Sequence, residues 1–450
     1  MRSKQFLRVS FGAAAAVLAP SAATASGFQI NQADARAIGL AYAGVASITG
    51  DVGLLAFTPA ALRGLKGLQA TLGGVYIAPT SEYQNAQASV LGGLVPVSGA
   101  TGGDDATPGV FIPTAAIGAK LSDRLAVGFS LHTPFGLSTE YDPSWVGRYQ
   151  AIKSEIVSVA GTFSVAHDIH PRATIAAGLR VQYFEAQFTN AVDAGSVAAA
   201  PPISSPIAVP TGEDMFADAS GDDIGYGFVL GVSAEPIDGF RVGASYVSAI
   251  EHELEGDAVF ALNGSASGAA LQSFGLLTNS PVTADIETPA TLALSADADL
   301  GEKTRLAVSL RRTFWSTFEE VRIEFANPAQ PDEVTSFNYK DQWAYSIGVE
   351  HQVTENAVAR FGVMRDETPV SDSFGSPRVP DESRWTVSAG LGVALSERVG
   401  LDLALSYLRT DDARVVVNGA LPENAARGSL AFDAKTDGVI GALRLTAAFN

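Results

Sequence analysis

The feature that most constrains the fold is a two-residue alternation of apolar with small or polar side chains. From Leu125 to Leu131 every second residue is large and apolar, and the pattern returns at 175–183, 399–407 and 439–449. Such alternation indicates β-strands with one apolar face. After residue 25 we find no apolar run approaching the roughly 18–20 residues of a membrane-spanning helix. The strands therefore belong to a transmembrane β-barrel or to a soluble β-sandwich or propeller.

The side chains on the other face of these strands favour the barrel. Arg180, Gln182, Asp402 and Arg444 alternate with the apolar residues. Charged groups are costly in a dry core, whereas a water-filled lumen accommodates them. The chain has no cysteine, so disulfides cannot order it, and a closed sheet is one alternative source of order.

The first 25 residues read as a secretory signal. They contain a basic start, an apolar stretch and a small-residue cleavage motif, namely Arg2, Lys4 and Arg8, then Val9 to Ala19, then Ala23-Thr24-Ala25. The net charge is −19, and about −22 without the three basic signal residues, which argues against nucleic-acid binding. We expect export to the cell outer membrane.

Connections between the predicted strands fall into two length classes. Six are short, at 122–124, 167–172, 236–239, 301–303, 354–356 and 396–398. Seven are long, at about 82–109, 141–151, 191–223, 253–285, 326–337, 366–383 and 414–427. Outer-membrane barrels combine short periplasmic turns with long external loops. Six turns, with both termini on the periplasmic side, predict an all-β barrel of fourteen antiparallel strands.

Residues 26–66 lack the alternation and form a separate unit. Residues 32–43 are expected to form a short helix, and Thr58 can cap a second helix that has Pro59 at its first position. Forty residues are too few to fold alone. The predicted division is a signal peptide at 1–25, a partly helical hatch inside the lumen at 26–66, and the barrel at 67–450.

Two local features depart from regular strands and loops. The third strand is interrupted at Pro134, which cannot donate to the ladder, and at Gly136, which permits a bend; the result is a gap in the wall or a harmless bulge. The fourth long connection carries the apolar residues Leu271, Phe274 and Leu277. They form either a small satellite core or an exposed surface that catches an apolar ligand.

The mature chain resembles the FadL/TodX outer-membrane transporters of long-chain fatty acids and other hydrophobic compounds. The resemblance rests on motifs in order along the chain: Gly27-Phe28-Gln29-Ile30-Asn31, Ala41-Tyr42-Ala43-Gly44, Thr58-Pro59-Ala60, Val75-Tyr76-Ile77, Pro134-Phe135-Gly136-Leu137, Trp145-Val146-Gly147-Arg148-Tyr149, Trp315-Ser316 with Phe318, Asp366 to Val370, and Pro377 to Asp381. It implies a fourteen-stranded barrel with an N-terminal hatch, which agrees with the count and the plug derived from spacing.

The resemblance also implies a route for the ligand. Ligand is captured between outer loops, passes to a pocket beside the hatch and leaves sideways at the kinked third strand. The ligand-binding residues expected on this basis are Phe28, Ile30, Tyr42, Leu62, Trp315, Phe318, Arg322, Leu271, Phe274 and Leu277. The hatch and lateral gate are expected at Thr58, Pro59, Ala60, Pro134, Phe135 and Gly136, with Thr58 where the family usually has asparagine.

The resemblance implies two basic residues that hold a ligand head group. One maps to Arg322 and the other falls near the uncharged Asn190, which leaves room for a neutral hydrocarbon as substrate. The alternative for Arg322 is a salt bridge to Glu319 or Glu320. The other expected partners are outer-membrane lipid and the barrel-assembly machinery, which reads an aromatic residue near the end, here Phe449. We expect a monomer.

Catalytic and metal-binding motifs are not found in the sequence. It has no H-E-x-x-H, no G-x-S-x-G and no P-loop, so we expect neither an enzyme nor a cofactor. Acidic pairs such as Asp222-Asp223 are expected to be solvated rather than to bind calcium. The alternative function is a general diffusion porin or a structural outer-membrane protein, and residues 26–66 discriminate best because a porin has an open lumen.

Overall fold

The computed structural model describes residues 27–104, 106–199, 203, 205, 208–371 and 374–449, so the predicted signal peptide lies outside the described residues. The helices are α2 (Ala35–Gly39), α3 (Ala194–Ala199) and α4 (Ala266–Ser273), with short 3-10 turns η1 (Val52–Ala56), η2 (Pro59–Leu62), η3 (Leu91–Gly93), η4 (Trp315–Thr317) and η5 (Pro422–Asn424). The strands are β1 (Leu68–Val90), β2 (Val95–Pro96), β3 (Gly103–Asp104), β4 (Val110–Lys120), β5 (Leu125–His132), β6 (Gly136–Glu140), β7 (Lys153–His170), β8 (Ala173–Asp193), β9 (Asp214–Ile237), β10 (Phe240–Val247), β11 (Ile250–Ala261), β12 (Ser280–Thr288), β13 (Thr291–Leu300), β14 (Thr304–Thr313), β15 (Glu320–Phe325), β16 (Glu333–Ser336), β17 (Gln342–Thr354), β18 (Ala357–Asp366), β19 (Arg384–Ala394), β20 (Val399–Thr410), β21 (Ala413–Val417) and β22 (Ser429–Phe449).

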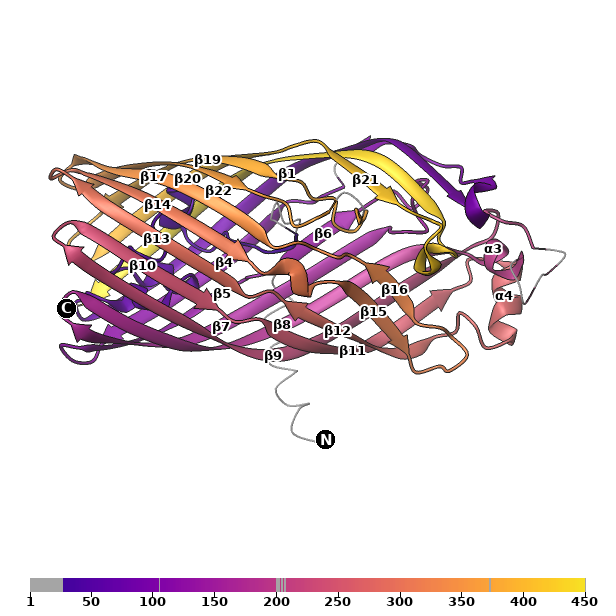
Figure 1. Cartoon of the computed structure of the whole chain (residues 1–450), viewed down its shortest axis with the longest axis horizontal. Coiled ribbons are helices and arrows are strands. Elements are labelled where there is room, and N and C mark those ends of the chain that lie inside the picture. The colour runs from indigo at the N-terminus through magenta and orange to yellow at the C-terminus, as the bar shows by residue number, and fades with distance from the viewer. Residues whose placement is uncertain are drawn as a thin grey trace.

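The strands form one closed antiparallel barrel whose long axis lies across Figure 1. The seam is a continuous ladder between the first and last strands, from Leu68 opposite Phe449 to Ser89 opposite Ser429. Several barrel strands are interrupted, so that consecutive segments such as β5 and β6, or β10 and β11, form one strand of the wall. Counted in this way, the described chain forms the fourteen strands that the turn spacing predicted.

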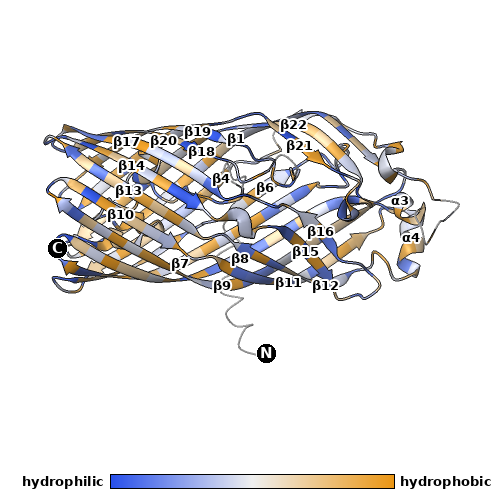
Figure 2. Ribbon diagram, in the orientation of Figure 1, coloured by the Kyte–Doolittle hydropathy of each residue, from blue (hydrophilic) through white to orange (hydrophobic). Residues whose placement is uncertain are grey.

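The alternation along each strand separates a lipid-facing from a lumen-facing side, as the striped colouring of Figure 2 shows. On β8 the outward Leu179 is 71% exposed, whereas its neighbour Arg180 points inward and is 4% exposed. Asp402 and Arg444 are buried on the inner face as well. A closed sheet pairs its backbone groups internally, which lets the outer face be apolar. Within the described residues, no helix is long and apolar enough to cross a membrane.

Several outer connections are shorter than predicted because the strands continue farther, and two of them show this most clearly. β8 and β9 pair as far as Asp193 and Asp214, and β11 pairs with β12 as far as Ala258 and Ser280. The prediction of loops over the whole of 191–223 and 253–285 was therefore wrong. The outward positions here are acidic, as in the cross-strand pair of Glu253 and Asp285. An apolar outer face is needed only within the lipid, so its end marks the edge of the membrane and not the end of the strand.

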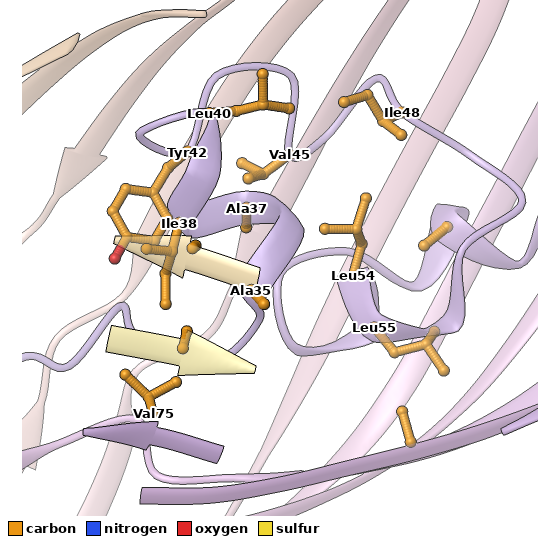
Figure 3. Packing of buried hydrophobic residues seen from close by; sticks show 14 of the residues in the cluster. Ala35, Ala37, Ile38, Leu40, Tyr42, Val45, Ile48, Leu54, Leu55 and Val75 are labelled. Atoms are coloured by element: carbon orange, nitrogen blue, oxygen red, sulfur yellow. The ribbon is translucent and has the colours of Figure 1, made fainter. Parts of the chain in front are cut away.

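Residues 27–66 lie inside the barrel and touch strands around it. Helix α2 packs against β18, β19, β20 and β22, η1 against β4 and β5, and η2 against β7, β8 and β9. The segment is held by a core of buried side chains, among them Ile38, Leu40, Leu54 and Leu55 (Figure 3). Backbone meets backbone at glycines of the wall: a Cβ on Gly243 would overlap the carbonyl oxygen of Ala46.

The helices of this segment are shorter than the sequence suggested. Helix α2 covers Ala35–Gly39 only, capped by the Asp34 side chain, which accepts from the Ala37 amide at 3.0 Å. It ends where Ala41 and Tyr42 adopt φ of 47° and 66°. These left-handed conformations cannot continue a right-handed helix. Thr58 caps η2, with Pro59 at its first position, as predicted.

A buried ionic network joins residues 27–66 to one side of the barrel wall. Arg444 of β22 contacts Asp34 at 2.7 Å, Asp51 at 2.8 Å and Asp402 at 2.6 Å. Arg36 bridges Asp51 and Glu350 of β17 at 3.1 and 2.7 Å. Because Arg444 and the four carboxylates are buried and Arg36 is largely covered, removing one partner would leave the others uncompensated. The network therefore fixes the segment against β17, β20 and β22.

Candidate ligand-binding and exit site

The third barrel strand is broken, and the break opens the hydrogen-bond ladder of the wall. β5 ends at His132 and β6 begins at Gly136. The β4–β5 ladder stops where Ala115 faces Leu131, and β6 pairs with β7. In the described chain, residues 110–114 of β4 pair only with β1 on their other side. One backbone bond, from the Glu140 amide to the Ala106 carbonyl at 2.8 Å, spans the outer end of the gap.

The first described residues of the chain occupy the inner side of this break. The Ile30 amide donates to the Pro134 carbonyl at 2.8 Å, and the Gly136 amide donates to the Phe28 carbonyl at 2.9 Å. These bonds flank an isolated antiparallel bridge between Gln29 and Phe135. The break thus borders the N-terminal segment instead of a neighbouring wall strand.

Two side-chain features make the break compatible with a buried backbone. The Ser158 hydroxyl of β7 accepts from the Phe135 amide at 2.8 Å and donates to the Phe135 carbonyl at 2.7 Å. Gly136 does not adopt a positive φ; a Cβ there would lie 2.7 Å from the Ile30 Cδ1. The missing side chain of Gly136 leaves room for Ile30 against the strand, and its part in a bend stays a prediction.

A cavity of about 80 Å³ lies directly behind the break. Its walls come from the N-terminal segment, from the kink and from β8 and β10 to β14. The apolar side chains that line it include Ile30, Tyr42, Val45, Phe57, Pro134, Phe135, Val247 and Ile250; the polar ones include His132, Arg180, Gln182, Ser248, Thr288, Thr291 and Arg311. Among the described residues, no Asp or Glu lines this cavity.

An aromatic cluster surrounds Phe28 at the start of the segment. The Phe28 ring is 4.7 Å from that of Trp315, 5.2 Å from Phe318 and 5.8 Å from Phe135 between ring centroids. Such spacings and tilts are favourable for aromatic pairs. The structure thus brings Phe28, Trp315 and Phe318 together beside the kink, while Ile30 and Tyr42 line the cavity.

Other predicted residues lie elsewhere. Leu62 packs in the core of residues 27–66, where its methyl group approaches Gly118 and Gly128. Leu271 and Leu277 are buried at the outer end of the barrel in a cluster with Met215, and Phe274 is 70% exposed. The fourth connection therefore contains both a satellite core and an exposed apolar side chain.

The Thr58-Pro59-Ala60 motif does not form the inner side of the gap. Its Thr58 hydroxyl and Ala60 amide lie against Gly231 of β9. Residues 28–30, and not this motif, make the backbone bonds to the kink, whereas η2 packs against β5 and β7. The place of the motif in a lateral gate stays a prediction. The sequence offered little signal for the pairing of residues 28–30, because the contacts to the kink are backbone bonds.

The basic residues near the expected head-group positions differ from the prediction. Arg322 is an exposed side chain paired with Glu320 at 2.7 Å and Asp332 at 3.4 Å, which is the salt-bridge alternative. At Asn190 the structure supplies a cation from another segment. Arg378, in the connection between β18 and β19, donates to the Asn190 side-chain oxygen at 3.3 Å and to the Ser154 hydroxyl at 3.2 Å.

Arg378 is buried, and no carboxylate lies within ion-pair distance of it among the described residues. Its guanidinium stacks 4.9 Å from the ring centroid of Phe188, which lines a second, smaller apolar cavity between β8, β9, β11, β12 and β15. Burial lowers the pKa of Arg378 to about 10, so it remains charged at neutral pH. Its position in the Pro377–Asp381 motif was the available sequence signal.

Metal coordination has little support in this geometry. Within the described residues no group of three or more His, Cys, Asp or Glu is placed to hold a metal ion. The polar groups of the kink cavity are guanidinium, imidazole, amide and hydroxyl. They suit hydrogen bonding to a ligand that has acceptor oxygens.

The family comparison decides the class of protein. Residues 16–449 match the model of the outer membrane protein transport protein family (OMPP1/FadL/TodX). The chain belongs to this family. It is therefore an outer-membrane protein, and family members are described as transport proteins. The long-chain fatty acid transport protein of Escherichia coli O6:H1 is 23% identical over 423 residues, which cover 91% of this chain and 92% of that protein. The 47 kDa outer membrane protein of Pasteurella multocida is 24% identical over 414 residues, 91% of this chain and 92% of that protein.

Solved structures of the family share the fold. The crystal structure of a Pseudomonas aeruginosa FadL homologue superimposes with a TM-score of 0.88 at 22% identity, covering 94% of this chain and all of that one. The Pseudomonas putida toluene transporter TodX gives a TM-score of 0.66 at 15% identity, covering 94% of this chain and 99% of that one. At these identities the likeness concerns the fold alone.

Proposed function

We propose that this family member takes up hydrophobic small molecules across the outer membrane and releases them sideways through the break in the third strand. The observation that carries the proposal is the cavity behind residues 133–135, which is lined in part by apolar side chains and closed by backbone bonds to residues 28–30. A relative that is named for long-chain fatty acids and a structural neighbour that is named for toluene support this class of ligand.

Lateral release is favoured by the energetics of an apolar ligand. Each CH₂ group that moves from an apolar environment into water costs roughly 0.8 kcal/mol. A ligand that crossed into the periplasm would lose this contribution along its length, whereas an opening to lipid avoids the loss. Residues 27–66 then act as a hatch that closes the lumen, and no catalytic step is required. A general diffusion porin is disfavoured because these residues fill the lumen.

Entry is proposed from the outer end. Phe274 is exposed on the connection that contains α4, and the aromatic cluster of Phe28, Trp315 and Phe318 is the proposed next contact before the kink cavity. Passage from the cavity to the lipid would require residues 28–30 to leave the kink. Since the ionic network holds the segment at other strands of the wall, β17, β20 and β22, only its first residues need to move.

The test is a reversible cross-link between residues 29 and 135. They form a bridge flanked by the bonds Ile30 to Pro134 and Gly136 to Phe28, a close pair of the kind whose Cα separation suits a disulfide. The chain has no cysteine, so Gln29→Cys with Phe135→Cys introduces the only pair. We expect oxidised cells to lose oleate and hydrocarbon uptake, and reductant to restore it.

Single-cysteine variants at 29 and at 135 provide the matched controls, because they make the same substitutions without the bond. Their uptake should not respond to reductant. Equal uptake by the oxidised and the reduced double variant would show that the ligand leaves by another route.

A further inference from the structure

The kink cavity contains an arginine that the protein does not neutralise. Arg180 is 4% exposed; its Nε donates to the Thr162 hydroxyl at 3.0 Å and its Nη2 to the Ala56 carbonyl at 3.4 Å. No carboxylate lies within 4.0 Å of it in the described part of the chain. Two other inward arginines of the wall strands are paired: Arg360 contacts Glu350 at 2.9 Å, and Arg444 contacts Asp402 at 2.6 Å. A buried cation without a counter-charge is costly unless a ligand supplies one.

Three further polar atoms in the same cavity lack partners. The His132 Nδ1, the Gln182 Oε1 and the Arg311 Nε are buried and make no hydrogen bond to the described residues. His132 and Gln182 are both at least nine-tenths buried. Buried polar groups are normally satisfied, so a cluster of unsatisfied ones marks a place that is occupied in the working protein. Water can fill part of this requirement, but it cannot balance the charge of Arg180.

The cavity is positively charged, whereas the molecule as a whole is negatively charged. The chain has 48 Asp and Glu against 29 Lys and Arg, yet two arginines and, among the described residues, no acid line this cavity. Arg311 is paired with Asp366 at 3.5 Å behind the lining, so the unbalanced charge is that of Arg180. Ile30, Phe57 and Phe135 supply apolar surface beside them. The space of about 80 Å³ is sufficient for a carboxylate and its first methylene groups. The lining therefore fits an acid that carries an apolar chain better than it fits a neutral hydrocarbon.

We propose that Arg180 binds the carboxylate of an acidic amphiphile in the kink cavity, immediately before the ligand leaves through the wall. His132, Gln182 and Arg311 surround this head group, and the apolar chain lies along Ile30 and Phe135 toward the break. The inference rests on the proposed function, since it specifies the chemical class of the ligand at the exit. It assigns Arg180 a role in specificity: acids gain a contact there that hydrocarbons of equal length do not.

The test measures ligand affinity rather than transport. Purified protein in nanodiscs of zwitterionic lipid is titrated with decanoate and with decanol, which differ in the head group only. Arg180→Gln should weaken decanoate binding at least tenfold and leave decanol binding unchanged, and Arg180→Lys should restore much of the decanoate affinity. Arg414→Gln, which removes an exposed arginine paired with Asp433, is the control and should change neither affinity.

A second variant keeps Arg180 in place. Gln182→Glu preserves the shape of the side chain and adds a carboxylate two residues along the same face of β8, where it competes for the guanidinium. It should weaken decanoate binding in the same way. Unchanged decanoate affinity in the folded variants, an equal loss for decanoate and decanol, or no decanoate binding by the wild-type protein would each overturn the carboxylate site. The disulfide experiment tests the exit route separately, so failure of one does not imply failure of the other.

Discussion

At the scale of single residues, the break in the wall depends on a serine that the sequence did not single out. Pro134 and Gly136 indicate where the strand is interrupted, but the freed backbone groups of Phe135 are satisfied by the Ser158 hydroxyl on the next strand. A serine in an alternating strand looks like any small lumen-facing residue. Its role depends on the register between β6 and β7, which places Gly136 opposite Val157.

Replacing Ser158 by alanine should destabilise the protein. The substitution leaves a buried amide and a buried carbonyl without partners, at a cost of about 1–3 kcal/mol. The measurement is the urea midpoint of the protein folded in lipid vesicles. Ser164→Ala on the same strand is the matched control, since the Ser164 hydroxyl is buried and makes no hydrogen bond to the described residues. Equal midpoints for the two variants would contradict this role of Ser158.

Asp381 should add a specific pH dependence. It lies in the outer connection before β19 and accepts from the Gly27 amide at 3.1 Å; burial raises its pKa to about 6, although Arg384 opposes the shift. A raised pKa means that the folded state binds the proton more tightly than the unfolded chain does. The contribution of this group to stability therefore increases as the pH falls through 6 and levels off near 4, by up to about 3 kcal/mol.

The measurement compares the urea midpoint of the wild-type protein with that of Asp381→Asn at pH 5 and at pH 7.5. Other carboxylates contribute equally to both proteins, so the difference between the two isolates Asp381. The variant should lack the gain at low pH. A constant difference between the two proteins at both pH values would show that Asp381 does not titrate in this range.

At the scale of elements, the sequence predicted the repeating strands and turns but not the contacts between residues that are far apart in the chain. The lipid-facing alternation located the strands, and the short turns gave their number. Arg378 was not predicted beside Asn190, because the connection from 367 to 383 folds back over β7 and β8, a contact between residues 188 positions apart. Arg322 was expected at a head-group position because of its spacing from Trp315. In the fold it lies beside Glu320 on the same strand and forms a salt bridge with that carboxylate instead.

The pairing of residues 28–30 with the kink was also beyond the sequence. Backbone hydrogen bonds carry no side-chain signature, so nothing in Gly27-Phe28-Gln29-Ile30 identifies the partner strand. The lining of the cavity could be predicted only in part from the sequence. The inward Arg180 and Gln182 were predicted to face the lumen, whereas the lack of an acid among the described residues that line the cavity follows from which strands meet there.

At the scale of the whole molecule, the closed lumen should control conductance. Deleting residues 27–61 removes the helix and both 3-10 turns but leaves the wall charges paired, since Arg360 still contacts Glu350 and Asp402. We expect the intact protein to show little conductance in planar bilayers and the deletion variant to form a stable open pore. A large, porin-like conductance of the intact protein would contradict a closed lumen.

The contact of glycines in the wall with the backbone of the inner segment limits how this protein can change. A Cβ on Gly243 would overlap the carbonyl oxygen of Ala46, and one on Gly362 would overlap the backbone of Leu40. The inner surface of the wall and the surface of residues 27–66 are therefore complementary in shape. A barrel that accepted the corresponding segment of a relative would need glycines at the same positions of its wall strands. We therefore expect chimaeras that exchange residues 27–66 alone to misfold. Chimaeras that also exchange the facing strands should fold. Inheritance of the two parts would then be joint, and the segment would not spread between relatives as an independent module.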